Sequence, residues 1–197
     1  MILGITGGTG CGKTTLLQLI RQRGGLVLDC DEIYHQLLIS DQALLEALHQ
    51  RFPLAFPSGS FDRKKLGSIV FADAQALRDL NAITHSAVRQ EVERRLEDAP
   101  PLAAIDAIGL FESGLNRLCD LTVAVTAPEE VRVQRLVPRD SISPEDARSR
   151  IAAQPSARWF AERCDAVLEN NGTAEEFRKK SIAFLDSHGI IKTVCSG

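Results

Sequence analysis

The sequence predicts a three-layer α/β fold, in which helices cover both faces of a five-stranded parallel sheet. Three observations lead to this prediction. Short apolar segments alternate with segments that have helical apolar spacing, a pattern typical of parallel sheets. The first apolar segment ends in a run of glycines, and one long, mostly helical stretch separates the second strand candidate from the third.

Five short apolar segments are the strand candidates. They cover residues 2–6, 26–28, 103–108, 121–125 and 166–168. The fourth is rich in β-branched residues, which favour strands. Ligands of such sheets bind beyond the carboxyl ends of the strands, so the residues that follow each strand are candidates for a site.

The helix candidates are bounded by capping residues. Thr14–Arg23 has helical spacing and ends at Gly24-Gly25. Pro128 is expected as the first residue of a helix, and Ser143 and Thr173 are expected as N-caps. A helical insertion is predicted at about residues 32–98, interrupted at Pro53 and Pro57–Gly59.

Composition limits the classes of protein to consider. The 197 residues suit a single domain, 1–197, and 44% hydrophobic with 25% charged residues is a globular balance. The net charge of −3 shows no basic excess, so we expect no nucleic-acid partner. No segment reaches the roughly 18 apolar residues of a membrane span, so we expect no membrane partner.

The five cysteines are widely spaced and form no C-x-x-C pair: Cys11, Cys30, Cys119, Cys164 and Cys195. This spacing argues against a disulfide framework and a structural zinc site. The first residues, Met1–Ile5, lack the features of a signal peptide. We therefore expect a cytoplasmic protein with reduced thiols, either a monomer or a weak homo-oligomer.

Gly7–Thr14 reads GGTGCGKT and fits the phosphate-loop pattern G-x-x-x-x-G-K-[ST] at every position. In such a loop, backbone N–H groups and a helix N-terminus face phosphate oxygens. Lys13 would bridge the β- and γ-phosphates of ATP, and the Thr14 hydroxyl would coordinate Mg²⁺. The predicted nucleotide-binding residues are Gly8, Thr9, Gly10, Cys11, Gly12, Lys13, Thr14 and Thr15.

Cys11 lies within this loop, at the start of a predicted helix. The helix N-terminus would lower the pKa of a thiol and raise its reactivity, so one hypothesis is a reactive cysteine that Mg-ATP protects. The alternative is a small, shielded side chain that fills space.

Asp29 and Asp31 directly follow the second strand candidate. Residues two apart in an extended chain point to the same side, so both carboxylates could face the phosphates. One could accept a proton from a hydroxyl or hold a Mg²⁺-bound water. Alternatively, Asp31 is the N-cap of a helix that begins at Glu32. The spacing leaves both interpretations open.

The sequence resembles the dephospho-CoA kinases in a series of segments that span about 170 residues. These are Ile5–Thr15, Asp29–Asp31, Phe61–Phe71, Leu80–His85, Ile105–Leu115, Arg135 with Arg139-Asp140, Ile151–Gln154 and Asp165–Gly172. Three positions depart from the family pattern. Cys11 replaces a usual serine, Ser86 replaces the proline after His85, and Ile108-Gly109-Leu110 replaces P-L-L.

The resemblance implies a P-loop kinase fold and the reaction of ATP with dephospho-CoA to give ADP and CoA, the last step of CoA synthesis. It implies that Asp31 is the general base, with Lys13 and Arg139 as further catalytic residues. It also implies an acceptor-binding insertion and a short lid at about 137–154. The substrate-binding candidates are Asp29, Arg63, His85 and Glu112. Two alternatives stay open: a kinase for another small hydroxyl or nucleotide acceptor, and a non-catalytic nucleotide-dependent switch.

Seven arginines lie between Glu130 and Arg163. Arg139 is expected in a mobile loop between two helices, where its planar guanidinium could neutralise a phosphoryl group in transfer. By contrast, Arg132, Arg148 and Arg150 fit a solvated helix face.

Three other polar residues have two interpretations each, and a fourth is only a weak candidate. Asp106 is either an acid near Mg²⁺ or the partner of a neighbouring group, because an uncompensated carboxylate in a strand is costly. Asn170 either contacts adenine or forms a plain turn. His85 is either a packing residue or lines the acceptor site, and Gln154 is a weaker pocket candidate.

Overall fold

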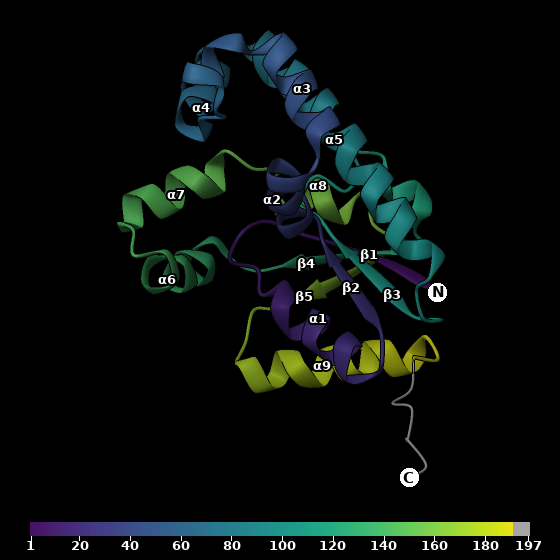
Figure 1. Ribbon diagram of the computed structural model, residues 1–197. Coiled ribbons are helices and arrows are strands. Elements are labelled where there is room, and N and C mark those ends of the chain that lie inside the picture. The colour runs from purple at the N-terminus through teal and green to yellow at the C-terminus, as the bar shows by residue number, and fades with distance from the viewer. Residues whose placement is uncertain (191–197) are drawn as a thin grey trace. The chain divides into compact units, whose positions relative to one another are not determined.

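The computed structural model describes residues 1–190 (Figure 1). Within these residues one sheet has five strands in the order β2-β3-β1-β4-β5. The strands are β1 (Ile2–Thr6), β2 (Leu26–Asp29), β3 (Ala103–Asp106), β4 (Leu121–Thr126) and β5 (Ala166–Glu169). β1 pairs in parallel with β3 and β4, and β4 pairs in parallel with β5. The predicted five-stranded parallel sheet is confirmed.

The register brings the carboxyl ends of the central strands to one edge. Ile5 of β1 lies opposite Asp106 of β3 and Val123 of β4. β3 ends two residues before its predicted end, although the Ala107 N–H still donates to the Ile5 carbonyl at 3.1 Å. The loop that follows β1 therefore starts beside the last residue of β3.

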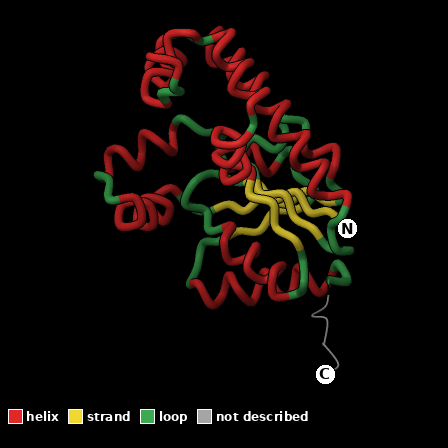
Figure 2. Tube along the Cα trace, in the orientation of Figure 1, coloured by secondary structure: helices red, strands yellow, loops and turns green. Residues whose placement is uncertain are grey.

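The described residues form two compact units, 1–28 with 98–190 and 29–97. The first unit contains the sheet, and Figure 2 shows α1 and α9 together on one side of it. Leu16 and Ile20 of α1 and Phe177 and Leu185 of α9 are buried in the same core as Leu3 of β1. Helices of this unit are α1 (Lys13–Gln22), η3 (Leu115–Leu118), α6 (Glu129–Asp140), α7 (Pro144–Ala152), α8 (Ala157–Ala161) and α9 (Ala174–Ser187).

The second unit, 29–97, is helical. It contains α2 (Cys30–Ser40), α3 (Gln42–Arg51), η1 (Pro53–Ala55), η2 (Pro57–Gly59), α4 (Arg63–Ala72) and α5 (Ala74–Glu97). The long helix α5 packs against α2, α3 and α4. Prolines begin both short 3₁₀ helices, as the predicted interruptions at Pro53 and Pro57 require.

Two predicted helix starts are confirmed and one is wrong. The Ser143 Oγ accepts a hydrogen bond from the Asp146 N–H at 3.0 Å, and Thr173 forms a capping box with Glu176. Pro128, expected as the first helical residue, is instead the N-cap of α6, because its ψ of 147° is extended. The first helical residue is Glu129.

The expected loop around Arg139 is also wrong, because α6 continues through Pro138 to Asp140. Pro138 cannot donate the hydrogen bond four residues back that other helical residues make, so α6 reaches Asp140 with one bond missing. The helix ends at Ser141, which has a left-handed φ of 53° and donates its N–H to the Val137 carbonyl. Arg139 thus lies in the last turn of a helix.

Four cysteines lie within the described residues, and Cys11, Cys30, Cys119 and Cys164 are all reduced thiols, as predicted. Cys195 lies outside these residues. Among the helices of residues 1–190, none combines the length and the apolar character that crossing a membrane requires.

Candidate active site

The phosphate loop joins β1 to α1 and depends on glycine at two positions. Gly7 has a φ of 136°, and a Cβ there would lie 2.1 Å from the Val125 carbonyl oxygen. Gly12 has a φ of 89°, and a Cβ there would lie 2.3 Å from the Asn170 Nδ2. Other residues would be strained and would collide with backbone or with a buried amide. The loop therefore curls tightly against the ends of β4 and β5.

Lys13, the first residue of α1, reaches back across this loop. Its Nζ donates to the Gly7 carbonyl at 3.0 Å and lies 3.8 Å from Oδ1 of Asp106. Both side chains are 14% exposed. The ion pair bears out one of the two interpretations of Asp106, the one in which its charge is balanced by a neighbouring group.

Arg132 of α6 supports the loop, and its predicted place on a solvated face is wrong. The side chain is only 6% exposed. Its Nε donates to the Thr9 carbonyl at 2.8 Å and its Nη2 to Oε1 of Gln154 at 3.2 Å. Helical spacing could not distinguish the side of α6 that meets the loop from the side that meets water. Arg148 and Arg150 are exposed, as predicted.

Arg135 and Asn170 hold the other half of the loop. The Arg135 Nη1 donates to the carbonyls of Gly10 at 3.2 Å and Cys11 at 3.3 Å, and its Nη2 donates to Oδ1 of Asn170 at 3.1 Å. The Asn170 Nδ2 donates to the Cys11 carbonyl at 2.9 Å. Asn170 is 4% exposed, so it is a structural support for the loop rather than part of a plain turn. The adenine contact stays a prediction.

Gln154, a weak pocket candidate in the sequence, is also a loop contact. Its Oε1 accepts the Thr9 N–H at 2.8 Å as well as the Arg132 guanidinium. The residue follows α7 directly, where Ala153 ends the helix. Sequence reasoning missed the roles of Arg132 and Gln154, because their loop partner is more than a hundred positions away.

Arg139 lies at the same loop. Its Nη2 donates to Oγ1 of Thr9 at 3.3 Å, and its Nε and Nη2 donate to the carboxylate of Asp140 at 2.7 and 3.0 Å. Arg150 donates to the same carboxylate at 3.0 Å. The hydrogen bonds raise the pKa of Arg139 and lower the pKa of Asp140. The arginine side chain is exposed, in reach of a ligand at the loop.

Cys11 is a shielded side chain. It is 3% exposed and belongs to the core cluster that contains Leu16 and Val125. This burial favours the space-filling interpretation over the reactive thiol, because an alkylating agent has to reach the sulfur.

The helical unit holds the two aspartates, and here one expectation is wrong. Asp29, not Asp31, is the N-cap of α2, which begins at Cys30 rather than at Glu32. The Asp29 Oδ1 accepts the N–H groups of Asp31 at 3.0 Å and Glu32 at 3.1 Å. Asp31 is therefore helical, and the assumption that both aspartates lie in an extended chain fails. The Asp31 side chain is exposed.

The same unit contains Arg63 and His85. The Nη1 of Arg63 lies 2.7 Å from the Nε2 of His35, a residue that sequence reasoning missed. Burial raises the pKa of the neighbouring Tyr34, and the charge of Arg63 opposes this shift. His85 is half-buried on α5. The remaining substrate-binding candidate, Glu112, is exposed in the turn after β3 and belongs to the sheet unit.

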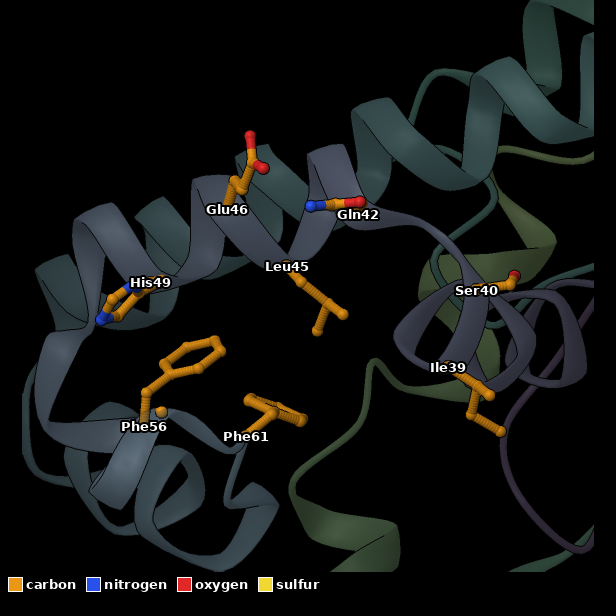
Figure 3. A pocket seen from close by; sticks show the side chains of 9 residues that line it. Ile39, Ser40, Gln42, Leu45, Glu46, His49, Phe56 and Phe61 are labelled. Atoms are coloured by element: carbon orange, nitrogen blue, oxygen red, sulfur yellow. The ribbon is translucent and has the colours of Figure 1, made fainter.

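A cavity of about 430 Å³ opens within the helical unit (Figure 3). Its lining residues are Ile39, Ser40, Gln42, Leu45, Glu46, His49, Phe56, Gly59 and Phe61. The rings of His49 and Phe56 lie 4.8 Å apart, and those of Phe56 and Phe61 lie 5.3 Å apart. Among these nine described residues only Glu46 is an acid, and none is Lys or Arg. Of these residues only Phe61 falls in a segment that the family resemblance singled out, because the others come from several short elements.

Comparisons with known proteins point to one family. The family model for dephospho-CoA kinase matches residues 1–176. A dephospho-CoA kinase of Symbiobacterium thermophilum is 38% identical over 183 residues, which are 90% of this chain and 77% of that protein.

Two solved structures are similar along nearly their whole length. The structure of TT1252 from Thermus thermophilus has a TM-score of 0.81 and 34% identity, and the match covers 95% of this chain and 97% of that one. Dephospho-CoA kinase from Campylobacter jejuni has a TM-score of 0.66 and 25% identity, covering 96% and 98%. With a phosphate loop supported by distant polar side chains, and with these matches over most of its length, the chain belongs to the dephospho-CoA kinase family.

Proposed function

We propose that this chain transfers the γ-phosphoryl group of ATP to the ribose 3′-hydroxyl of dephospho-CoA, giving CoA and ADP. One observation carries the proposal: a complete phosphate loop, with Lys13 across its mouth, in a chain that matches this kinase family over residues 1–176. The reaction would be the last step of CoA synthesis. It needs charge neutralisation and positioning more than covalent chemistry.

Two cations of the sheet unit would supply positive charge. Lys13 would exchange its contact with the Gly7 carbonyl for the β- and γ-phosphates, and Arg139 would donate to the transferring group. Both side chains lie at the phosphate loop, since Lys13 is part of it and Arg139 contacts Thr9. The backbone N–H groups from Gly10 to Thr15 would cradle the phosphates.

The residues present also fit Mg²⁺. Magnesium prefers oxygen ligands and usually takes only one or two from the protein, the rest coming from phosphates and water. Thr14 offers an exposed hydroxyl in the first turn of α1, and Asp106 offers a carboxylate at the end of β3. No group of three or more acidic, histidine or cysteine side chains within residues 1–190 would make an all-protein site. Bound there, the metal would neutralise phosphate charge.

Asp31 is the proposed general base. The carboxylate of Asp29 accepts two backbone N–H groups at the start of α2, which makes its role mainly structural. Asp31 lies two residues further on, in the first turn of α2, and its side chain is exposed. An exposed carboxylate without that capping task is the better candidate to take a proton from the ribose hydroxyl.

The helical unit is the proposed acceptor site. Arg63 suits the acidic diphosphate of dephospho-CoA because its guanidinium can donate several hydrogen bonds at once. The cavity at Phe56 suits the uncharged pantetheine arm, since its rings and aliphatic groups lie beside the neutral polar side chains of Ser40 and Gln42, and Glu46 would repel a phosphate. His85 and Glu112 stay candidates for further contacts. We also propose a cytoplasmic location for the reaction, and a monomer or weak homo-oligomer.

A coupled assay of ADP release tests the proposal. ATP and Mg²⁺ are supplied with dephospho-CoA, and in parallel with a panel of other small hydroxyl compounds and nucleosides. We expect turnover with dephospho-CoA and a CoA product phosphorylated at the 3′ position. Faster turnover with another acceptor would reassign the substrate, and nucleotide binding without transfer to any acceptor would favour a switch protein.

A further inference from the structure

All three polar atoms of Thr9 contact residues of the segment 132–154. The N–H donates to the Gln154 Oε1 at 2.8 Å, and the carbonyl accepts from the Arg132 Nε at 2.8 Å. The hydroxyl accepts from the Arg139 Nη2 at 3.3 Å. One residue in the middle of the phosphate loop thus meets α6 twice and the end of α7 once.

The contacts of Arg132 and Gln154 with the backbone of Thr9 fix this part of the loop. Arg132 is almost fully buried, and hydrogen bonds with a charged donor are stronger than neutral ones. Its guanidinium also reaches the oxygen of Gln154 that accepts the Thr9 N–H, so the three groups form a closed set of contacts. A Cβ at Gly8 would lie 2.4 Å from the Arg132 Nη2, so the adjoining loop residue leaves just enough room for this arginine.

The hydroxyl contact differs, because it acts on an exposed side chain. Arg139 is also held by the carboxylate of Asp140, which accepts from its Nε and Nη2 and which Arg150 holds in turn. Asp140 alone would orient the guanidinium toward its own helix end. The Thr9 hydroxyl accepts from the same Nη2 that donates to Asp140, and this second bond ties the guanidinium to the phosphate loop.

We propose that Thr9 is a positioning residue for Arg139: its backbone is fixed by Arg132 and Gln154, and its hydroxyl holds the Arg139 guanidinium at the phosphate loop. The inference rests on the proposed function, in which Arg139 neutralises the transferring phosphoryl group. Thr9 itself would then act on turnover through the arginine. A loop in which Thr9 merely fills space would show no such dependence.

Thr9→Val tests the role of the hydroxyl, because valine keeps the shape and the backbone contacts of threonine. We expect kcat to fall about fivefold, the size of one ordinary hydrogen bond, because the contact is long and exposed, while the KM for ATP changes less than about twofold. Thr9→Ser, which keeps a hydroxyl, should restore most of kcat. Arg148→Gln, an exposed arginine of α7 that binds Glu130, is the matched control and should leave kcat unchanged.

A double-mutant cycle shows whether Thr9 acts through Arg139. Methionine at position 139 removes every donor, so Thr9→Val should change kcat by less than about twofold in the Arg139→Met background. If Thr9→Val lowered kcat by the same factor in both backgrounds, the inference would be overturned. A rise in the KM for ATP with an unchanged kcat, or a Thr9→Ser variant as slow as Thr9→Val, would overturn it as well.

A measurement without acceptor separates this inference from the proposed function. The Nε–H NMR signal of Arg139, identified by its absence in Arg139→Met, should shift in Thr9→Val and return in Thr9→Ser. An unchanged signal would overturn the inference even in an active kinase. If the protein instead failed to phosphorylate dephospho-CoA while the signal shifted as expected, the proposed function would fail and the contact would stand.

Discussion

The phosphate loop and the aspartate turn both follow strands of the same sheet, but they are held in different ways. The loop after β1 is supported by side chains far away in sequence, with Arg132 123 positions from Thr9 and Asn170 159 positions from Cys11. The turn after β2 is supported locally, since Asp29 binds the N–H groups two and three residues ahead. The difference teaches that polar segments after two strands can be held by unlike means: one needs contacts across a whole unit, and the other needs only four neighbouring residues.

The largest expected effect separates the two aspartates of the local turn. Asp31→Asn removes the proposed base, and turnover should fall about 10²–10⁴-fold with ATP binding by calorimetry nearly intact. Asp29→Asn should cost much less, because asparagine caps a helix about as well as aspartate. The opposite ranking would make Asp29 the base. Thermal unfolding of both variants ensures that folded proteins are compared.

The next effect concerns the cation of the phosphate loop. Lys13→Ala removes the ammonium that faces the Gly7 carbonyl and Asp106. We expect turnover to fall at least about a hundredfold, the scale of one lost electrostatic contact to the transition state. Steady-state ADP release measures it, and near-normal turnover of a folded variant would contradict the assignment of the loop.

The long-range support of the loop is tested at Asn170. Asn170→Ala leaves the Cys11 carbonyl and the Arg135 guanidinium without this partner. We expect a loss of about 1–3 kcal/mol in the free energy of unfolding, together with a raised KM for ATP. Denaturant unfolding measures the free energy of unfolding, and steady-state kinetics measure the KM for ATP.

Asn171→Ala is the matched control for this test, since Asn171 is the exposed neighbour of Asn170 in the chain. It should change neither quantity appreciably. Equal effects of the two substitutions would mean that the loop does not depend on the buried amide.

A smaller effect is expected from the cavity of the helical unit. Phe56→Ala should raise the KM for dephospho-CoA about fivefold, through loss of apolar contact, and leave the KM for ATP unchanged. Phe71→Ala is the control, because Phe71 lies in the same unit and is 90% exposed. A larger change in the KM for ATP than for the acceptor would exclude the cavity as an acceptor site.

The smallest expected effect is on the thiols of the sheet unit. Cys11 is buried, and burial raises the pKa of Cys119 to about 12 and that of Cys164 to about 11. A thiol with a raised pKa stays protonated, and so unreactive, until the pH approaches that value. At pH 8, iodoacetamide should therefore inactivate the enzyme slowly, with or without Mg-ATP. Rapid inactivation that Mg-ATP prevents and that is absent in Cys11→Ser would restore the reactive-thiol hypothesis.

The sequence alone determined the features that depend on neighbours in the chain. The five strand segments, the phosphate loop and the caps at Ser143 and Thr173 follow from apolar periodicity, glycine spacing and hydrogen bonds across three residues. The family resemblance rests on the same local segments, and the matched family confirms it.

The tertiary structure alone decided which polar side chains support the loop. Helical spacing places Arg132 and Arg148 on a helix surface, but only the order of the strands brings α6 and the end of β5 to the loop after β1, so that Arg132 and Asn170 become buried. The same holds for Arg139. The local pattern assigned this residue to a loop, but α6 continues to Asp140 and ends only at the left-handed Ser141. A contact over more than a hundred residues depends on how the strands are ordered and paired, and no short segment of the sequence contains that information.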